Sequence, residues 1–122
     1  MTDDATTLAQ MKLSVAGFIR EREWEKYHQP KNLAMSIAIE AAELMEVFQW
    51  AEPDEVARLL ADEKVRRQVS DELADILAFL LAFSNATGID LAASFRDKMN
   101  RNAQKYPADQ CRGNYQRPSR GG

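Results

Sequence analysis

The residues of this chain that could carry chemistry are two pairs of carboxylates, Glu40 with Glu43 and Glu72 with Asp75. The members of each pair are three residues apart, so they share one face of a helix. Glu40 also falls at helical spacing on an apolar stripe, which consists of Leu33, Ile37, Leu44 and Val47. An ionised carboxylate that is removed from water destabilises a protein unless a cation compensates it. The spacing therefore predicts carboxylates on the apolar side of a helix, where a cation is needed to compensate their charge.

Two helices that each offer such a pair could converge on one site lined by oxygen atoms. No Lys or Arg lies within four residues of Glu40 or Glu43 to neutralise them. Mg²⁺, or Mn²⁺ in its place, is favoured over Zn²⁺, because every candidate ligand is an oxygen and the chain has one histidine and one cysteine. The alternative is a solvated helix face, on which such pairs are common.

A cation site of this kind usually acts on phosphates, so polar and basic donors are expected to accompany it. Lys98, Asn102 and Lys105 recur at helical spacing, and Tyr106 follows them. These residues predict one donor-rich helix face for binding phosphate. The alternative is the solvated end of a helix, where cations are favoured in any case.

Aromatic side chains near a phosphate site could hold a nucleobase by stacking. The candidates are Trp24, Trp50 and Phe79, together with His28. For the two tryptophans the alternative is ordinary core packing. His28 has no second ligand at metal-binding spacing, so we expect a structural hydrogen bond or a contact with the base.

Helices must position these residues, because the apolar residues recur at helical spacing and no strand-like alternation occurs. We expect an all-α protein of four to five helices. Turn signals divide them into residues 7–25, 30–50, 54–61, 64–86 and 90–105, with Asp54 and Asp90 as N-caps and Gly88 as a C-cap. The predicted domain covers residues 1–107, and residues 108–122 are expected to form a flexible tail.

The composition of the 122 residues excludes several classes of protein. The net charge of −3 argues against a dedicated duplex-binding protein, so no stable nucleic-acid partner is expected. A single cysteine, Cys111, and an acidic start without a signal-peptide pattern favour a reducing, cytoplasmic location. The longest apolar run, Ile76–Phe83, has eight residues, whereas a membrane span needs about 20. Contact with RNA or a partner through tail residues Arg112, Arg117 and Arg120 is the alternative to a solvated tail.

The fourth predicted helix is apolar over most of its circumference, through Leu73, Ile76, Leu77, Phe79, Leu80, Leu81 and Phe83. One layer of helices does not need so much buried surface. We therefore expect a second copy of the chain to cover part of it, in a homodimer or homotetramer.

Several separated blocks of this sequence resemble a known family. Glu40-Ala41-Ala42-Glu43, a gap of 28 residues and Glu72-Leu73-Ala74-Asp75 resemble the ExxE…ExxD signature of the MazG-like all-α nucleoside triphosphate pyrophosphohydrolases. The segments 22–33, 48–50 and 98–107 are similar to its deoxycytidine triphosphate pyrophosphatase branch. Two positions differ from the pattern: Ile39 stands where many MazG-like proteins have an acidic residue, and Phe79 stands where the animal deoxycytidine enzymes would have a tyrosine.

The resemblance implies Mg²⁺-dependent cleavage of a (d)NTP, with dCTP or a modified dCTP preferred, to the monophosphate and pyrophosphate. It implies that Glu40, Glu43, Glu72 and Asp75 hold Mg²⁺ and that one of them orients or deprotonates the attacking water. Lys98, Asn102 and Tyr106 would contact phosphates, and Trp24, His28, Trp50 and Phe79 would line the base and sugar pocket. It also implies a homotetramer. The alternatives are a non-catalytic helical nucleotide-binding or oligomerisation module and the same fold acting on another phosphoanhydride.

Overall fold

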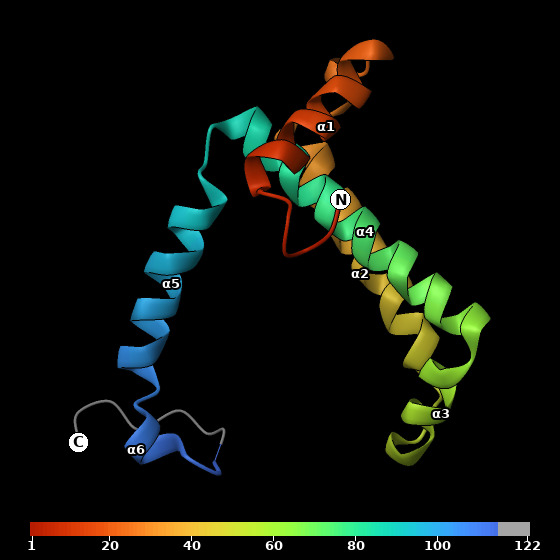
Figure 1. Ribbon diagram of the computed structural model, residues 1–122, viewed down its shortest axis with the longest axis vertical. Helices are drawn as coiled ribbons and strands as arrows, with labels where there is room; N and C mark the ends of the chain where they lie inside the picture. The colour runs from red at the N-terminus through yellow and green to blue at the C-terminus, as the bar shows by residue number, and fades with distance from the viewer. Residues whose placement is uncertain (115–122) are drawn as a thin grey trace. The chain divides into compact units, whose positions relative to one another are not determined.

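All the regular secondary structure is helical in the part of the chain that the computed structural model describes, residues 1–114 (Figure 1). No β-strand occurs in this range, which confirms the predicted all-α class. The α-helices are α1 (Leu8–Glu21), α2 (Pro30–Phe48), α3 (Val56–Ala61), α4 (Glu63–Thr87), α5 (Leu91–Lys105) and α6 (Ala108–Cys111). Two 3-10 turns, η1 (Glu25–Tyr27) and η2 (Pro53–Glu55), lie before α2 and α3.

The chain divides at Gly88 into two compact units, Met1–Gly88 and Ile89–Gly122. The expected single domain up to residue 107 stays a prediction. The first unit contains α1 to α4, and the second contains α5 and α6. Gly88 ends α4 in the left-handed conformation, with φ 73°, and its N–H donates to the Ser84 carbonyl. This is the C-cap that the sequence predicted, and glycine suits it because it has no Cβ to clash.

Capping residues explain most of the helix boundaries. The Asp90 side chain accepts a hydrogen bond from the Ala93 N–H, as the sequence predicted. The prediction of Asp54 as an N-cap was wrong: Pro53 starts η2 one residue earlier, and Asp54 lies inside that turn. The predicted first helix was also too long, because the chain turns sharply after Arg22.

The core of the first unit is small and lies where α1, α2 and α4 meet. Ile19, Leu33 and Ala82 form its buried centre, and Val15, Phe79 and Phe83 pack around them. Figure 1 shows α2 and α4 side by side, and they form the most extensive helix pair. α1 packs against α4, and the Asn85 side chain of α4 donates a 3.0 Å hydrogen bond to the Lys12 carbonyl of α1. This packing brings residues of α1, α2 and α4 together at one end of the α2–α4 pair.

Large apolar side chains remain exposed on both long helices of the first unit. Ile39 on α2 is 57% exposed, and Leu73 on α4 is 53% exposed. Met35, Met45, Leu77 and Leu80 are exposed as well. The sequence predicted this uncovered apolar surface on α4. Among the described residues no single helix has the length and apolar composition of a membrane span.

The second unit begins with α5 and continues into α6, where we expected a flexible tail. Residues 108–111 form a short helix because the Pro107 carbonyl accepts hydrogen bonds from the backbone N–H groups of Gln110 and Cys111. Arg112 follows as its exposed C-cap. Arg117 and Arg120, the other tail arginines considered above, lie outside the described residues.

Candidate functional site

Three carboxylates from the two long helices converge in the first unit. Glu40 and Glu43 come from α2, and Glu72 comes from the facing side of α4. One oxygen from each lies within 4.8 Å of the others. We call these residues the acidic cluster. The structure thus brings together three of the four carboxylates that the sequence singled out.

The acidic cluster is partly buried and lacks a cationic side chain. Glu40 and Glu72 are half-buried, and the Oε2 atom of each is buried with no donor to satisfy it. Within residues 1–114, the two ion pairs join Arg22 to Glu21 and Arg96 to Asp97, so neither involves the cluster. Buried carboxylate oxygens normally have a partner, and orphaned ones indicate that an ion or a proton completes the site.

When no cation is bound, a proton on Glu72 completes the site. The pKa of Glu72 is raised from its ordinary 4.5 to about 7. The largest cause is a hydrogen bond to Glu40, which only the protonated Glu72 can donate; partial burial and the negative charge of Glu43 add to it. The cluster therefore resists carrying its full negative charge, which is the electrostatic condition that a cation relieves.

The donor set of the acidic cluster fits a hard divalent cation. All three groups offer carboxylate oxygens, which Mg²⁺ and Mn²⁺ prefer, and no cysteine or histidine belongs to the group. Glu40, Glu43 and Glu72 would hold the ion. The orphaned Oε2 atoms and the raised pKa of Glu72 supply the structural support for this fit.

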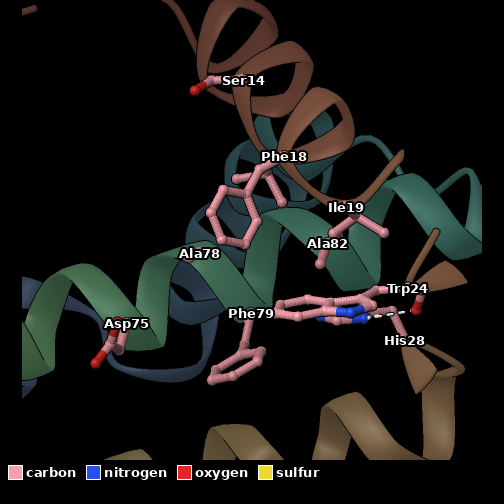
Figure 2. A pocket seen from close by; sticks show the side chains of 10 residues that line it. Ser14, Phe18, Ile19, Trp24, His28, Asp75, Ala78, Phe79 and Ala82 are labelled. Carbon is pink, nitrogen blue, oxygen red and sulfur yellow. Dashed lines mark hydrogen bonds between the residues drawn. The ribbon is translucent and has the colours of Figure 1, made fainter. Parts of the chain in front are cut away.

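Asp75, the fourth predicted ligand, is not a member of the acidic cluster. It lies one helical turn beyond Glu72 on α4 and lines a neighbouring pocket instead. Figure 2 shows its side chain beside this pocket, along α4 from Phe79. Its predicted role as a metal ligand stays a prediction.

The pocket has a volume of about 390 Å³ and is enclosed by α1, the connection between α1 and α2, and α4. Its walls are mostly apolar and aromatic (Figure 2). Trp24, His28 and Phe79, three of the four residues predicted to contact a base, line it together. The remaining lining residues are Ser14, Val15, Phe18, Ile19, Asp75, Ala78 and Ala82. We call this space the aromatic pocket.

Trp24 and His28 present two parallel rings to the aromatic pocket. Their ring centroids are 6.4 Å apart and their planes differ by 7°. The Nδ1 atom of His28 lies 3.0 Å from the Trp24 carbonyl oxygen. A carbonyl oxygen only accepts, so Nδ1 carries the hydrogen, and Nε2 is the acceptor of the neutral ring. The pair thus combines a stacking surface with a polar ring edge.

Sequence reasoning placed Phe18 only on the apolar stripe of the first helix and missed its place in the pocket wall. Its ring meets that of Trp24 edge to face, with centroids 5.9 Å apart and planes inclined by 73°. The available signal was the helical spacing of Ser14 and Phe18, which puts both on the face of α1 that lines the pocket.

Trp50 does not line this pocket. It lies beyond the end of α2 and is 86% exposed. The 19 residues of α2 span about 28 Å, and they separate Trp50 from His28. Within one chain the two residues therefore cannot contact the same base, and the predicted role of Trp50 would require a second copy.

The predicted phosphate-binding residues belong to the second unit. Lys98 and Asn102 lie four residues apart on α5, and Tyr106 is its C-cap. Lys98 is exposed and Asn102 is half-buried. The Asn102 carbonyl accepts the Tyr106 N–H at 2.8 Å, and the Lys105 ammonium lies 5.3 Å from the centroid of the Tyr106 ring. Their role in binding phosphate stays a prediction.

The described residues thus hold a carboxylate cluster and an aromatic pocket within a few turns of α4. A model of the MazG-like family matches residues 35–117. The chain belongs to the MazG-like family. The matched segment includes the whole acidic cluster and Asp75, whereas Trp24 and His28 precede it.

Proteins that are similar to this MazG-like chain are named as pyrophosphatases. The dCTP pyrophosphatase 1 of Rattus norvegicus is 36% identical over 107 residues, and that of Homo sapiens is 35% identical over 106 residues. These matches cover 88% and 87% of this chain but 63% and 62% of those proteins. The crystal structure of a pyrophosphatase from Archaeoglobus fulgidus superposes with a TM-score of 0.78 and 37% identity, covering 88% of this chain and 98% of that one. The MazG-like fold is therefore shared with a protein named for phosphoanhydride cleavage.

Proposed function

We propose that this MazG-like chain is a nucleoside triphosphate pyrophosphohydrolase that depends on Mg²⁺ or Mn²⁺. It would cleave a (d)NTP, with dCTP or a modified dCTP preferred, to the monophosphate and pyrophosphate, and so would clear unwanted nucleotides from the pool. The observation that carries the proposal is the arrangement along α4. Glu72 belongs to the acidic cluster, and Asp75 and Phe79 line the aromatic pocket one and two turns further on. A nucleotide matches both features, because its phosphate chain suits a cation held by the acidic cluster and its flat base suits the aromatic pocket.

The chain's own residues would divide the work between the two ends of the substrate. The acidic cluster would hold the cation, which when bound supplies the positive charge that draws electron density off the phosphate oxygens. Trp24 and Phe79 would hold the base by stacking, and His28 would offer its polar edge. The apolar walls would exclude bulk water from that end.

The hydrolytic step needs one water and one proton acceptor. The water oxygen would form a bond to phosphorus, and the bond from the α-phosphorus or β-phosphorus to their bridging oxygen would break, so that pyrophosphate and monophosphate separate. The proton lost by the water would pass to a carboxylate. Asp75 is the candidate acceptor, because it lines the pocket one helical turn beyond Glu72 and is not a member of the acidic cluster.

The proposal includes a homodimer or homotetramer. The exposed apolar residues of α2 and α4 support it, because monomeric proteins rarely leave such surfaces uncovered. In such an assembly Trp50 of one copy could reach the pocket of another. Lys98, Asn102 and Tyr106 would supply the donors for the phosphate chain.

One assay tests the proposal directly. The purified protein is incubated with canonical and modified NTPs and dNTPs in Mg²⁺ or Mn²⁺, and the products are separated by chromatography. We expect monophosphate and pyrophosphate, with dCTP or a modified dCTP turned over fastest and no product in a chelator. Inorganic phosphate as the first product would overturn the proposal, because a different phosphoanhydride bond would then be cleaved. No product from any nucleotide by an intact oligomer would overturn it in favour of another phosphoanhydride substrate or a non-catalytic module.

A further inference from the structure

The turn that ends α1 has an unusual backbone conformation for its sequence. Glu23 has φ 52°, and it is the one residue other than glycine with positive φ among residues 1–114. The Trp24 N–H donates to the Ile19 carbonyl at 3.0 Å, and the Glu23 N–H donates to the Arg20 carbonyl at 3.0 Å. These two bonds define a Schellman turn, in which glycine usually occupies the position of Glu23 because a Cβ is disfavoured there.

This turn determines where Trp24 lies. It folds the chain back so that the Trp24 ring meets Phe18, six residues earlier, and the two form adjacent walls of the aromatic pocket. The Arg22 side chain packs against Phe18 and lies near the Trp24 ring. Its guanidinium carbon is 3.7 Å from the centroid of the Phe18 ring and 6.0 Å from that of the Trp24 ring, and its NH1 group donates to the Phe18 carbonyl at 3.0 Å.

The effect of the turn extends to His28. The carbonyl that accepts the Nδ1 hydrogen of His28 belongs to Trp24, and the two rings stack. A change in the backbone at Trp24 would therefore move both the acceptor and the stacked partner of His28. Two parallel rings of the pocket depend on one backbone conformation.

The side chain of Glu23 offers no other explanation for its position. It is exposed, it does not line the aromatic pocket, and no ion pair or side-chain hydrogen bond involves it in the described part of the chain.

We propose that Glu23 is a positioning residue whose left-handed backbone conformation, rather than its carboxylate, sets Trp24 and His28 for stacking on the nucleobase. The inference rests on the proposed function, because it assigns the aromatic pocket to the base. Glu23 touches neither substrate nor cation in this proposal. It acts through Trp24.

A matched pair of variants separates the backbone from the carboxylate. Glu23→Gly and Glu23→Val both remove the charge, but glycine adopts positive φ readily and β-branched valine does not. Kinetics on the preferred nucleotide are measured with Trp50 intact. Fluorescence is measured with Trp50→Phe added, because the chain has two tryptophans and Trp24 then reports alone.

We expect Glu23→Gly to keep the KM of the parent protein and the Trp24 emission of the Trp50→Phe protein. We expect Glu23→Val to raise KM about tenfold, the scale of losing one aromatic stack on a base, with kcat changed less than twofold and Trp24 emission shifted to the red. A Glu23→Val protein that melts earlier but keeps KM and emission would overturn the proposal. An equal rise in KM for both variants would overturn it too, because the carboxylate would then be responsible.

The experiment also distinguishes failure of this inference from failure of the proposed function. If the parent protein hydrolyses no nucleotide, the proposed function fails, and the emission spectra still decide whether the turn positions Trp24: unchanged emission in Glu23→Val overturns the inference. If Glu23→Val does not fold, Glu23→Ala takes its place, because alanine keeps the penalty at positive φ without the branched Cβ. Glu23→Asn, which tolerates this conformation, is expected to match Glu23→Gly.

Discussion

Glu72 on α4 and Glu40 on α2 bring carboxylate oxygens within 4.8 Å of each other across the two helices. The hydrogen bond that a protonated Glu72 would donate to Glu40 is the main reason that the pKa of Glu72 rises from 4.5 to about 7. The folded chain therefore binds a proton that the unfolded chain releases between these two values. This contribution to stability is fully present below pH 4.5 and is lost as the pH rises through 7.

We predict that the cation-free protein becomes less stable as the pH rises from 4.5 to 7 and that Mg²⁺ or Mn²⁺ offsets this loss. The cation replaces the proton between the carboxylates, so its affinity should increase over the same range. Melting temperatures measured across pH, in chelator and in excess cation, would show it. Glu72→Gln is the control, since it should flatten the pH dependence in chelator; a slope that persists in this variant would assign it to other groups.

Glu43→Gln should leave the fold intact and lower kcat/KM by about a hundredfold or more, because it removes one of three clustered ligand groups. It should also reduce the rise in melting temperature that Mg²⁺ produces. Glu46→Gln is a matched control: it makes the same change on α2, three residues further on, at an exposed position outside the acidic cluster. Equal losses in both variants would argue against a cation at the cluster.

Asp75→Asn should abolish most turnover while keeping more of the stabilisation by Mg²⁺ than Glu43→Gln does. The reason is that Asp75 lines the aromatic pocket and is not a member of the acidic cluster. Steady-state kinetics and melting with titrated Mg²⁺ measure the two effects separately. Asp71→Asn on the same helix is the control at an exposed position. If Asp75→Asn loses cation stabilisation as completely as Glu43→Gln, Asp75 is the fourth ligand that the sequence predicted.

Helical periodicity predicted the parts of the site that depend on a single helix or on two helices packed along their length. Glu40 lies half-buried on the same stripe as the buried Leu33, and Glu72 faces it because α2 and α4 pair. Gly88 and Asp90 were found because their roles depend on neighbouring residues alone.

The sequence failed where a position depends on a turn. Glycine normally occupies the left-handed position of such a turn, so the glutamate at position 23 gives no local signal for this conformation. The predicted helix therefore ran on to Glu25, and Phe18 was left out of the pocket wall. Trp50 lies beyond the end of α2 that is far from His28, and its predicted contact with a base stays a prediction.

The apolar faces of α2 and α4 lead to the last prediction, which concerns assembly. Leu73→Glu should convert the proposed dimer or tetramer to smaller species, because it would place an unpaired charge where apolar side chains would be buried, each contributing about 1.5–3 kcal/mol. Light scattering after gel filtration measures the mass. Arg66→Glu, an exposed charged position on α4, is the control and should keep the parent mass. A parent protein that is monomeric at micromolar concentration would contradict the prediction and would leave Trp50 without a pocket, whereas dissociation accompanied by loss of turnover would mean that the site needs the second copy.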